Sequence, residues 1–570
     1  MKKGNTAASR PKSKRNTGTK TGESRFKSEE NEKPVYKSKS SKGSSRDASK
    51  GSPKGSPRDA SKGSLKGSSR DASMGSPKGS SKNTSKGSSK DSSKGSSKVS
   101  AYSRKRSDAS RRPQLNKDQK SLETHFVTKC YEMDYEGKGI VKNGKDSYSV
   151  PNLLIDEVAK FEIIRRGRKP SVKIVEMIKT SPKRIAPLCD VSDSCGGCQL
   201  QHLSYKGQLE YKQNTVVKLL GQFGKVSPII GMKNPDHYRN KVHASFSADT
   251  RGKIVSGIYE EESHRVISIN NCKIQDERAN QIINSIREMM PSFKMKPYDE
   301  DSERGFLRHV LIRTGHKSGE VMVVLVVGSP IFPARNHFVK KLIERHPEIT
   351  TIVQNLNNRR TSMVLGDRET VLYGKGYIED TLCDTIFRIS AKSFYQINSV
   401  QTEVLYGEAI KMAKLKGDEI VLDAYSGIGT ISLIVSQSVQ HVTGVELNRD
   451  AVRDAIANAK RNHIDNVRFN HGDAGEFLLG VAREKEHLDV VFMDPPRSGS
   501  DDAFLEALKV LKPNKIVYIS CNPVTLARDL NKLTGSGYKV SGIQPVDMFP
   551  GTMHVEVVCE IVRNNKGFED

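Results

Sequence analysis

The sequence predicts a multidomain protein with a disordered basic tail, an OB-like β-barrel, an α+β central domain that carries a cysteine cluster, and a Rossmann-like α/β domain. Three observations predict it. The N-terminal segment is of low complexity and rich in Ser, Lys and Gly, a stretch of short β-like runs follows, and apolar strands alternate with helices towards the C-terminus. The expected boundaries are residues 1–120, 121–180, 181–385 and 386–570.

The tail, residues 1–120, holds most of the positive charge. It contains 33 Lys and Arg but only 10 Asp and Glu, in a chain of 570 residues with a net charge of +28. The tetrapeptide RDAS recurs at Arg46, Arg58 and Arg70. Such a segment buries too little apolar surface to offset chain entropy, so we expect disorder. Two interpretations fit it: an electrostatic tether to RNA, and a solvated extension without a specific role.

The composition argues against a membrane or secreted protein. No run of about 18 apolar residues is present. The basic N-terminus lacks the apolar core of a secretory signal. Eight cysteines in such a chain fit a reducing compartment, where clustered cysteines more often bind metal or perform chemistry than form disulfides. We therefore expect a cytoplasmic monomer without a membrane partner.

Residues 121–180 contain short β-like runs that are broken by Gly137, Gly139, Gly144 and Pro151. This spacing is typical of a small barrel. Basic residues gather in the run IIRRGRK. The segment resembles a TRAM domain, an OB-like RNA-binding barrel, and the alternative is a generic barrel that serves as a spacer.

The next segment, residues 181–385, begins with three cysteines in CDVSDSCGGC, Cys189, Cys195 and Cys198. We expect Cys272, in INNCKIQ, to be a fourth ligand supplied from a distant loop. Four thiolates suit either a [4Fe-4S] cluster or tetrahedral zinc, and the spacing does not separate the two; four free thiols are the remaining alternative. The later runs HYRNKVHASFS, HVLIRTG and GEVMVVLVVG predict an antiparallel sheet.

The segment from about residue 386 predicts a doubly wound parallel sheet with a cofactor loop after its first strand, in VLDAYSGIGT. Gly427 and Gly429 let the backbone approach a ligand. Glu446 ends the next strand, where a carboxylate can bind ribose hydroxyls, and Asp473 follows the third strand, where it can face an adenine edge. No GxGxxG is complete and no phosphate clamp stands out, so S-adenosylmethionine fits better than a dinucleotide. The alternative is a structural glycine turn.

A reacting site is predicted at the ends of two later strands. Asp494 in MDPPRSG is placed to orient a planar base, although such a motif also fits methylation of an adenine amino group. Cys521 in SCNP lies where a strand meets a helix, and a helix N-terminus can lower a thiol's pKa, so we expect a thiolate there. A core thiol is the alternative.

A thiolate and a carboxylate together suit one reaction on uracil. Addition of the thiolate to C6 makes C5 nucleophilic towards a methyl sulfonium, and a base must then remove the C5 proton. Glu556, in HVE, is the candidate base, and an ordinary salt-bridge role is its alternative. His554 would share a face with Glu556 if both lay on a strand.

Taken together, these motifs resemble the RNA uracil-C5-methyltransferase family, over about residues 121–570. The matching motifs are SFYQIN, DAYSGIGT, GVELN, GDA, MDPPRSG, SCNPVTLARD and HVE. The resemblance implies that Cys521 is the nucleophile and Glu556 the base. It further implies contacts to the methyl donor or the target base from Gln396, Tyr425, Thr430, Glu446, Asp473 and Asp494. Members often carry Asn where Thr430 stands, and Thr can still donate and accept a hydrogen bond.

The barrel and the cysteine cluster resemble the 23S rRNA branch of this family. That resemblance implies a [4Fe-4S] cluster, with zinc as the less favoured metal, and methylation of a uridine in 23S rRNA that is flipped out of a loop. The tRNA branch is more compact and usually lacks both features. A tRNA uracil-C5-methyltransferase and a non-catalytic RNA-binding ribosome assembly factor are the alternatives.

Overall fold

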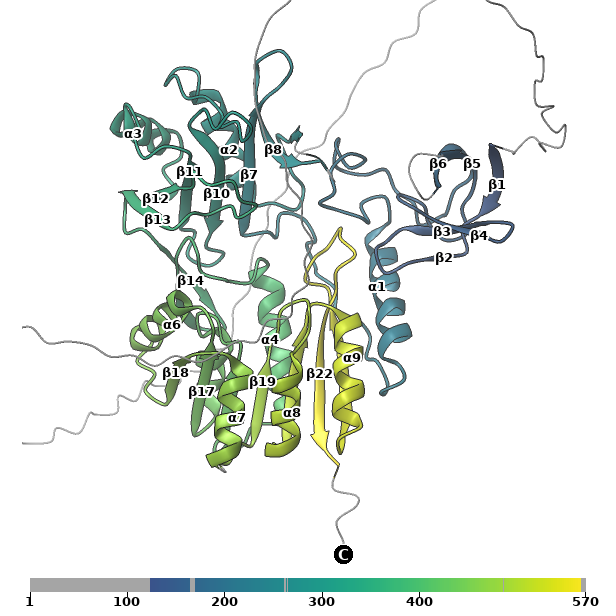
Figure 1. The fold of residues 1–570 in the computed structure, drawn as a ribbon, viewed down its shortest axis with the longest axis vertical. Coiled ribbons are helices and arrows are strands. Elements are labelled where there is room, and N and C mark those ends of the chain that lie inside the picture. Colours follow the sequence, from purple (N-terminus) through teal and green to yellow (C-terminus); the bar gives the residue numbers. More distant parts are fainter. Residues whose placement is uncertain (1–123, 165–169, 261–262, 264, 485, 565–570) are drawn as a thin grey trace, which may run out of the picture. The chain divides into compact units, whose positions relative to one another are not determined.

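The computed structural model describes residues 124–164, 170–260, 263, 265–484 and 486–564 (Figure 1). The predicted disordered tail with its RDAS repeats, and the RRGRK part of the predicted basic cluster, lie outside these residues. Among the described residues, no helix has the length and apolar character needed to cross a bilayer.

Residues 125–179 form two small antiparallel sheets around a shared apolar core, in the orders β1-β5-β6 and β2-β3-β4. Their strands are β1 (His125–Lys129), β2 (Glu132–Met133), β3 (Gly139–Asn143), β4 (Asp146–Val150), β5 (Val158–Ile164) and β6 (Ser171–Lys179). Gly139 is required by packing, because a Cβ there would lie 2.7 Å from the carbonyl oxygen of Leu153 and 2.8 Å from the sulfur of Cys130. Cys130 is a buried core thiol.

A mixed sheet forms the centre of the next part, in the order β13-β12-β11-β10-β7-β8-β9. The expected antiparallel sheet is confirmed for the runs named from the sequence, since β10 pairs antiparallel with both β7 and β11. The sheet extends beyond them, and β12 pairs parallel to β11. Helix α3 connects these two strands, and such a crossover returns the chain in the same direction. The elements are α1 (Tyr205–Leu220), β7 (Lys241–Ala248), β8 (Ile254–Tyr259), β9 (Val266–Ser268), α2 (Glu277–Met289), β10 (Leu307–Thr314), β11 (Val321–Val327), α3 (Arg335–Arg345), β12 (Ile349–Leu356) and β13 (Arg368–Tyr373).

The C-terminal part confirms the predicted Rossmann-like α/β fold, with the strand order β18-β17-β16-β19-β20-β22-β21 (Figure 1). The sheet is not wholly parallel, because β22 is antiparallel to both of its neighbours. The loop between β21 and β22 is too short for a crossover. The elements are β14 (Ile378–Leu382), β15 (Thr385–Ile389), α4 (Ser399–Ala413), β16 (Ile420–Ala424), α5 (Thr430–Val435), η1 (Ser436–Ser438), β17 (His441–Glu446), α6 (Arg449–Arg461), β18 (Val467–His471), α7 (Ala474–Glu484), β19 (Val490–Met493), α8 (Asp502–Leu511), β20 (Lys515–Ser520), α9 (Pro523–Thr534), β21 (Tyr538–Val546) and β22 (Glu556–Arg563).

Helices cover both faces of this sheet, as two apolar clusters show. Residues of α4, α5 and α6 pack on one face, and residues of α7, α8 and α9 pack on the other. Val216 and Leu220 of α1 join the second face, although α1 precedes the central sheet in the chain. The first face also includes Leu311 and Met322 of the central sheet. The two sheets therefore share a continuous core.

A buried ion pair fixes α1 to the loop between β21 and β22. Both side chains are fully buried, and Nζ of Lys212 lies 2.6 Å from Oδ1 of Asp547. The same ammonium group donates to the carbonyl of Phe549 at 3.0 Å. Burial lowers the pKa of Lys212, and the charge of Asp547 opposes this shift. The pair joins residues 335 positions apart in the sequence.

We expect Lys212→Met to lower the free energy of unfolding by about 3–5 kcal/mol, because the substitution leaves the Asp547 carboxylate buried without its partner. Urea denaturation followed by far-UV circular dichroism measures the change. Lys183→Met is the matched control, since Lys183 pairs with Glu210 at the surface, and its cost should stay below about 1 kcal/mol. Equal costs for the two variants would contradict this account of the pair.

Candidate active site

The predicted site residues follow the carboxyl ends of neighbouring strands. Tyr425 follows β16, Asp494 follows β19 and Cys521 follows β20. Strand order reverses between β16 and β19, and open α/β sheets bind ligands at such a switch point. The site is thus built where the topology leaves a crevice at the sheet edge.

Cys521 and Glu556 are brought together by the antiparallel pairing of β20 with β22. Ser520 pairs with Val557, and one step further along this register puts Cys521 opposite Glu556. Asn522 then caps α9 by accepting a hydrogen bond from the backbone N–H of Val524 at 3.1 Å, with Pro523 in the first turn. The thiol therefore lies directly between the end of β20 and the capped start of α9.

The thiol is protonated in this environment, which corrects the expected thiolate. Burial, followed by the charges of Glu556 and Asp494, raises the pKa of Cys521 to about 12. Burial and mutual repulsion also raise the pKa of the Glu556 carboxyl well above its ordinary range, and burial raises that of Asp494. The three acidic groups of the site therefore ionise less readily than they would in water.

Arg497 of the MDPPRSG loop supplies opposing positive charge, and sequence reasoning missed it. Its guanidinium counteracts the rise in the pKa of both Cys521 and Glu556. A guanidinium nitrogen lies 3.5 Å from Nε2 of His554. His554 precedes β22, whereas Glu556 is the first residue of that strand, and burial lowers the pKa of His554 to about 4. The sequence did offer one signal for Arg497, because this basic residue directly follows the two prolines of MDPPRSG.

Gln396 reaches Asp494 from the segment before α4. Its Nε2 donates to Oδ2 of Asp494 at 3.4 Å, and the Gln396 side chain is buried. Asn240, just before β7, donates to the backbone carbonyl of Gln396 at 2.9 Å. The segment that leads into the central sheet therefore helps to position an amide and a carboxyl, and the charge of this carboxyl acts on the thiol.

The glycine loop after β16 has the shape of a ligand cradle. Tyr425 adopts a positive φ of 68°, which turns the chain sharply, and a Cβ at Gly427 would meet nothing within 4 Å. The backbone N–H of Gly427 donates to Glu446 at 3.0 Å, and the hydroxyl of Tyr425 lies 3.2 Å from that of Ser500. An open backbone and a carboxylate beside it fit the nucleoside part of S-adenosylmethionine.

Two further predicted residues lie at helix starts. Thr430 begins α5, and its hydroxyl lies 3.3 Å from that of Tyr406. Asp473 accepts hydrogen bonds from the backbone N–H groups of Gly475 and Glu476, at 2.9 and 3.0 Å, so one of its oxygens caps α7. The structure does not bring Asp473 into contact with Cys521 or Glu556.

Two buried aspartates that sequence reasoning missed support the loops of the site. Asp423 accepts from the backbone N–H of Ser432 at 2.8 Å, and burial raises its pKa to about 7. Asp529 of α9 accepts from the Ser500 backbone N–H at 2.9 Å and from the Tyr518 hydroxyl at 2.8 Å. Both aspartates act by holding other residues in place. In the sequence, they were indicated only by their positions within the motifs DAYSGIGT and SCNPVTLARD.

The four predicted cysteine ligands border one cavity of about 200 Å³. They are Cys189, Cys195, Cys198 and Cys272. Within the described ranges, no three His, Cys, Asp or Glu side chains converge closely enough to hold a metal ion. The sulfur of Cys198 lies near Gly551, whose carbonyl accepts a hydrogen bond from the N–H of Leu200 at 2.9 Å. The cavity thus adjoins the loop that leads to Glu556.

Comparison with known proteins gives concordant matches. The family described as tRNA (Uracil-5-)-methyltransferase matches residues 204–563. An RNA methyltransferase of Oceanobacillus iheyensis is 41% identical over 461 residues, which is 80% of this chain and 98% of that protein. Another, of Halalkalibacterium halodurans, is 41% identical over 440 residues, which is 76% of this chain and 96% of that protein. The structure of Pyrococcus abyssi tRNA (uracil-54, C5)-methyltransferase with S-adenosyl-L-homocysteine matches with a TM-score of 0.64 and 27% identity, covering 77% of this chain and 100% of that chain.

The protonated thiol predicts slow alkylation of Cys521 by iodoacetamide. Its rate should rise about tenfold per pH unit between about pH 7 and pH 10, because the raised pKa lies above this range. At about pH 9, Glu556→Gln should accelerate the reaction several-fold by removing a negative charge beside the sulfur. Mass spectrometry of the peptide that contains Cys521 gives the rate.

The control is Glu560→Gln, at a buried carboxylate on the same strand that pairs with Lys414 and Lys515 instead. It should leave the rate of Cys521 alkylation within about twofold of the unaltered protein. A pH-independent rate would show that the thiol is already ionised at pH 7, which contradicts the raised pKa. Equal acceleration in both variants would show that Glu556 has no special influence on the sulfur.

Proposed function

The chain belongs to the RNA uracil-C5-methyltransferase family, and from this premise we propose that it methylates C5 of a specific uridine in 23S rRNA. Family membership makes it an RNA methyltransferase that uses S-adenosylmethionine. The observation that carries the residue assignment is the placement of Cys521 opposite Glu556 at the sheet edge where Asp494 and Gln396 meet.

In the proposed reaction Cys521 is the nucleophile. The thiol first loses its proton to solvent water, and the positive charge of Arg497 favours this loss. The thiolate then forms a bond to C6 of uracil, and the electron pair of the C5–C6 double bond shifts towards C5 and the O4 carbonyl. S-adenosylmethionine supplies a methyl group as a sulfonium. C5 takes the methyl as the sulfonium carbon–sulfur bond breaks.

Glu556 completes the proposed reaction as the general base. Its carboxylate removes the C5 proton, the double bond re-forms, and the C6–sulfur bond breaks to release Cys521. The raised pKa of Glu556 suits a group that must hold a proton after abstraction. Asp494 and Gln396, which are hydrogen-bonded to each other, would orient the polar edge of the uracil.

The remaining site residues are proposed to hold the methyl donor. Glu446 would accept from the ribose hydroxyls, and Tyr425 would pack beside the adenosine with its hydroxyl held by Ser500. Thr430 would hydrogen-bond near the start of α5, and Asp473 would face the adenine with the oxygen that does not cap α7.

The choice of 23S rRNA rests on two features outside the methyltransferase fold. The double-sheet unit of residues 125–179 supports a TRAM-like RNA-binding role, and the cysteine cavity supports a cluster-bearing central domain. A tRNA substrate is the second candidate, because the matched family and the Pyrococcus abyssi enzyme are both named for tRNA. A non-catalytic assembly factor is disfavoured, since thiol, carboxylates and glycine loop are all retained.

We further propose that the four cysteines bind a [4Fe-4S] cluster. Their arrangement around one cavity supports a shared metal group. The choice of [4Fe-4S] over zinc rests on the resemblance to the iron–sulfur branch of the family. The cluster would brace the loop before Glu556, because Gly551 and Met553 of this loop hydrogen-bond to Leu200 and Gln199 of the cysteine segment.

Incubation with 5-fluorouridine-containing 23S rRNA and S-adenosylmethionine should trap a covalent protein–RNA complex, because fluorine at C5 cannot leave as a proton does. Denaturing gel electrophoresis detects the complex. Cys521→Ala should abolish it, whereas Cys559→Ala, which alters a core thiol of β22, should retain it. An adduct with tRNA but not with rRNA would identify tRNA as the substrate. No adduct with either RNA, while the methyl donor still binds, would support the assembly-factor alternative.

Glu556→Gln should accumulate the same kind of adduct on ordinary uridine, because the methylated intermediate cannot lose its C5 proton. Its turnover should fall by at least about a hundredfold. Mass spectrometry of the digested adduct should find a methyl group on the Cys521-linked base, and its absence would assign Glu556 to an earlier step.

Protein purified without oxygen should contain about four iron atoms per chain. It should also absorb visible light, as iron–sulfur clusters do. Cys198→Ser should lose both iron and absorbance, whereas Cys383→Ser, a change outside the cavity, should keep them. Stoichiometric zinc in place of iron would overturn the cluster assignment.

A further inference from the structure

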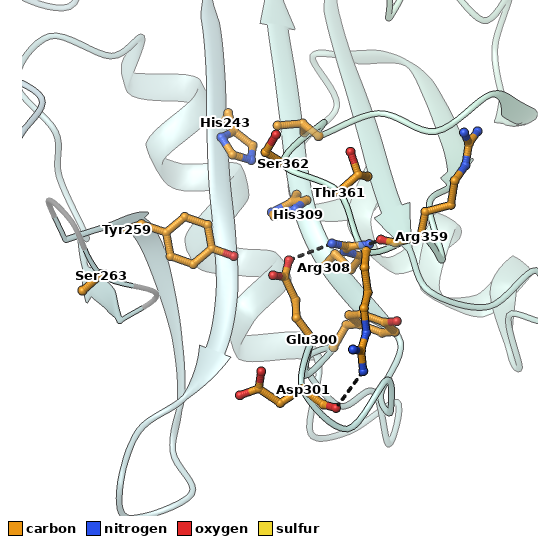
Figure 2. Close-up of a pocket in the computed structure, with 13 residues that line it drawn as sticks. His243, Tyr259, Ser263, Glu300, Asp301, Arg308, His309, Arg359, Thr361 and Ser362 are labelled. Carbon is orange, nitrogen blue, oxygen red and sulfur yellow. Dashed lines mark hydrogen bonds and ion pairs between the residues drawn. The ribbon is translucent and has the colours of Figure 1, made fainter. Parts of the chain in front are cut away.

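The central domain contains a second cavity, of about 570 Å³, that the proposed reaction does not use (Figure 2). It lies on the face of the central sheet opposite α2 and α3, to which alternate residues of β7 and β10 point. Thr361 and Ser362, from the segment between β12 and β13, border one side, and Tyr259 at the end of β8 borders another. The volume is typical of pockets that bind small organic groups.

Two imidazoles form part of the cavity wall. The rings of His243 and His309 lie 4.8 Å apart at 60°, and Nδ1 of His309 lies 3.2 Å from the hydroxyl of Ser245. Nε2 of His243 is buried and has no hydrogen-bond partner within the part of the chain that the structure describes. Burial lowers the pKa of His309 to about 3, so this ring is neutral and offers one donor and one acceptor nitrogen. Such groups suit the edge of a heterocyclic base.

Aromatic and cationic groups complete the lining. The guanidinium of Arg308 lies 4.9 Å from the ring centre of Tyr298 and is held by Glu300 at 2.7 Å. Tyr259 points towards Arg308 and Glu300 from the other side of the cavity (Figure 2). Arg359 and Arg360 line the cavity with side chains that are 60% and 73% exposed. Arg359 pairs with Asp367 and Arg360 with Glu303, and these exposed ion pairs can be exchanged for phosphates at low cost. Flat groups within the cavity and arginines at its rim thus match a base and its phosphates.

The cavity lies close to the candidate active site. Asn240, whose side chain binds the Gln396 carbonyl, is followed three residues later by His243, so the two are roughly 10 Å apart along an extended strand. Leu311, two residues from His309 on β10, packs into the core shared with the Rossmann-like sheet. An RNA strand whose uracil reaches Gln396 would therefore pass within a few nucleotides of the cavity.

We propose that this cavity is a second RNA subsite that takes one unstacked nucleotide near the target uridine. The base enters beside the tyrosine rings and is hydrogen-bonded by the imidazoles, while flanking phosphates face Arg359 and Arg360. The subsite selects single-stranded RNA, because a paired base must break its stacking to enter. The choice of RNA as ligand rests on the proposed function.

The test introduces a bulky side chain at the rim of the cavity, so that it blocks the space proposed for the base. Ser362→Trp places a large ring at an exposed lining position, and Met363→Trp is the matched control, because Met363 is 67% exposed and does not line the cavity. Fluorescence anisotropy measures binding of the full chain to a short labelled single-stranded oligoribonucleotide, in enough salt to suppress binding by charge alone. Ser362→Trp should weaken binding about tenfold, and Met363→Trp should leave it unchanged.

Two further comparisons sharpen the test. Arg360→Ala should weaken binding about threefold, whereas Arg345→Ala, which removes an exposed arginine paired with Glu288 on the same domain, should not. Annealing the oligonucleotide to its complement should remove the difference between Ser362→Trp and the unaltered protein.

The proposal is overturned if Ser362→Trp binds the single strand as tightly as the unaltered protein, or if Met363→Trp loses as much affinity. Binding requires no methyl transfer, so failure of adduct formation at Cys521 would refute the proposed function without deciding this test. A selective loss in Ser362→Trp would then still support an RNA subsite.

Discussion

The ion pair between Lys212 and Asp547 is the constraint on which the site's geometry depends. Both charges are fully buried, and each would cost several kcal/mol without the other, so α1 and the loop before β22 hold one relative position. Asn398 and Gln401 of the α4 region donate to backbone carbonyls of the same loop, each at 3.0 Å. This loop delivers Glu556 to the sheet edge, and three separate parts of the chain thereby set the position of one carboxylate.

The electrostatics of the site oppose ionisation of its acidic side chains. Asp494 and Glu556 raise the pKa of Cys521, and burial raises the pKa of all three groups. A protonated thiol reacts slowly with oxidants and alkylating agents. Arg497 opposes the rise in pKa, so in the proposed reaction its positive charge favours the thiolate.

The Rossmann-like fold could be predicted from local patterns, because strands, glycine turns and helix starts follow one another in order. The protonation of Cys521 could not, since it depends on carboxyls carried by other strands. The parallel pairing of β11 with β12 and the reversal at β22 likewise depend on how the chain crosses the sheets. Sequence reasoning missed Arg497, Asp423 and Asp529. Each of them acts on residues of another helix, strand or loop, and the sequence spacing does not show that these segments meet.

The placement of β22 between β20 and β21 gives one strand two purposes. Glu556, the proposed base, is its first residue, and its backbone pairs with β20 on one side and with β21 on the other. Loss of this pairing would leave both neighbours with unpaired edges, which favour aggregation. A substitution that dislodges β22 would therefore disrupt the sheet and displace the proposed base together.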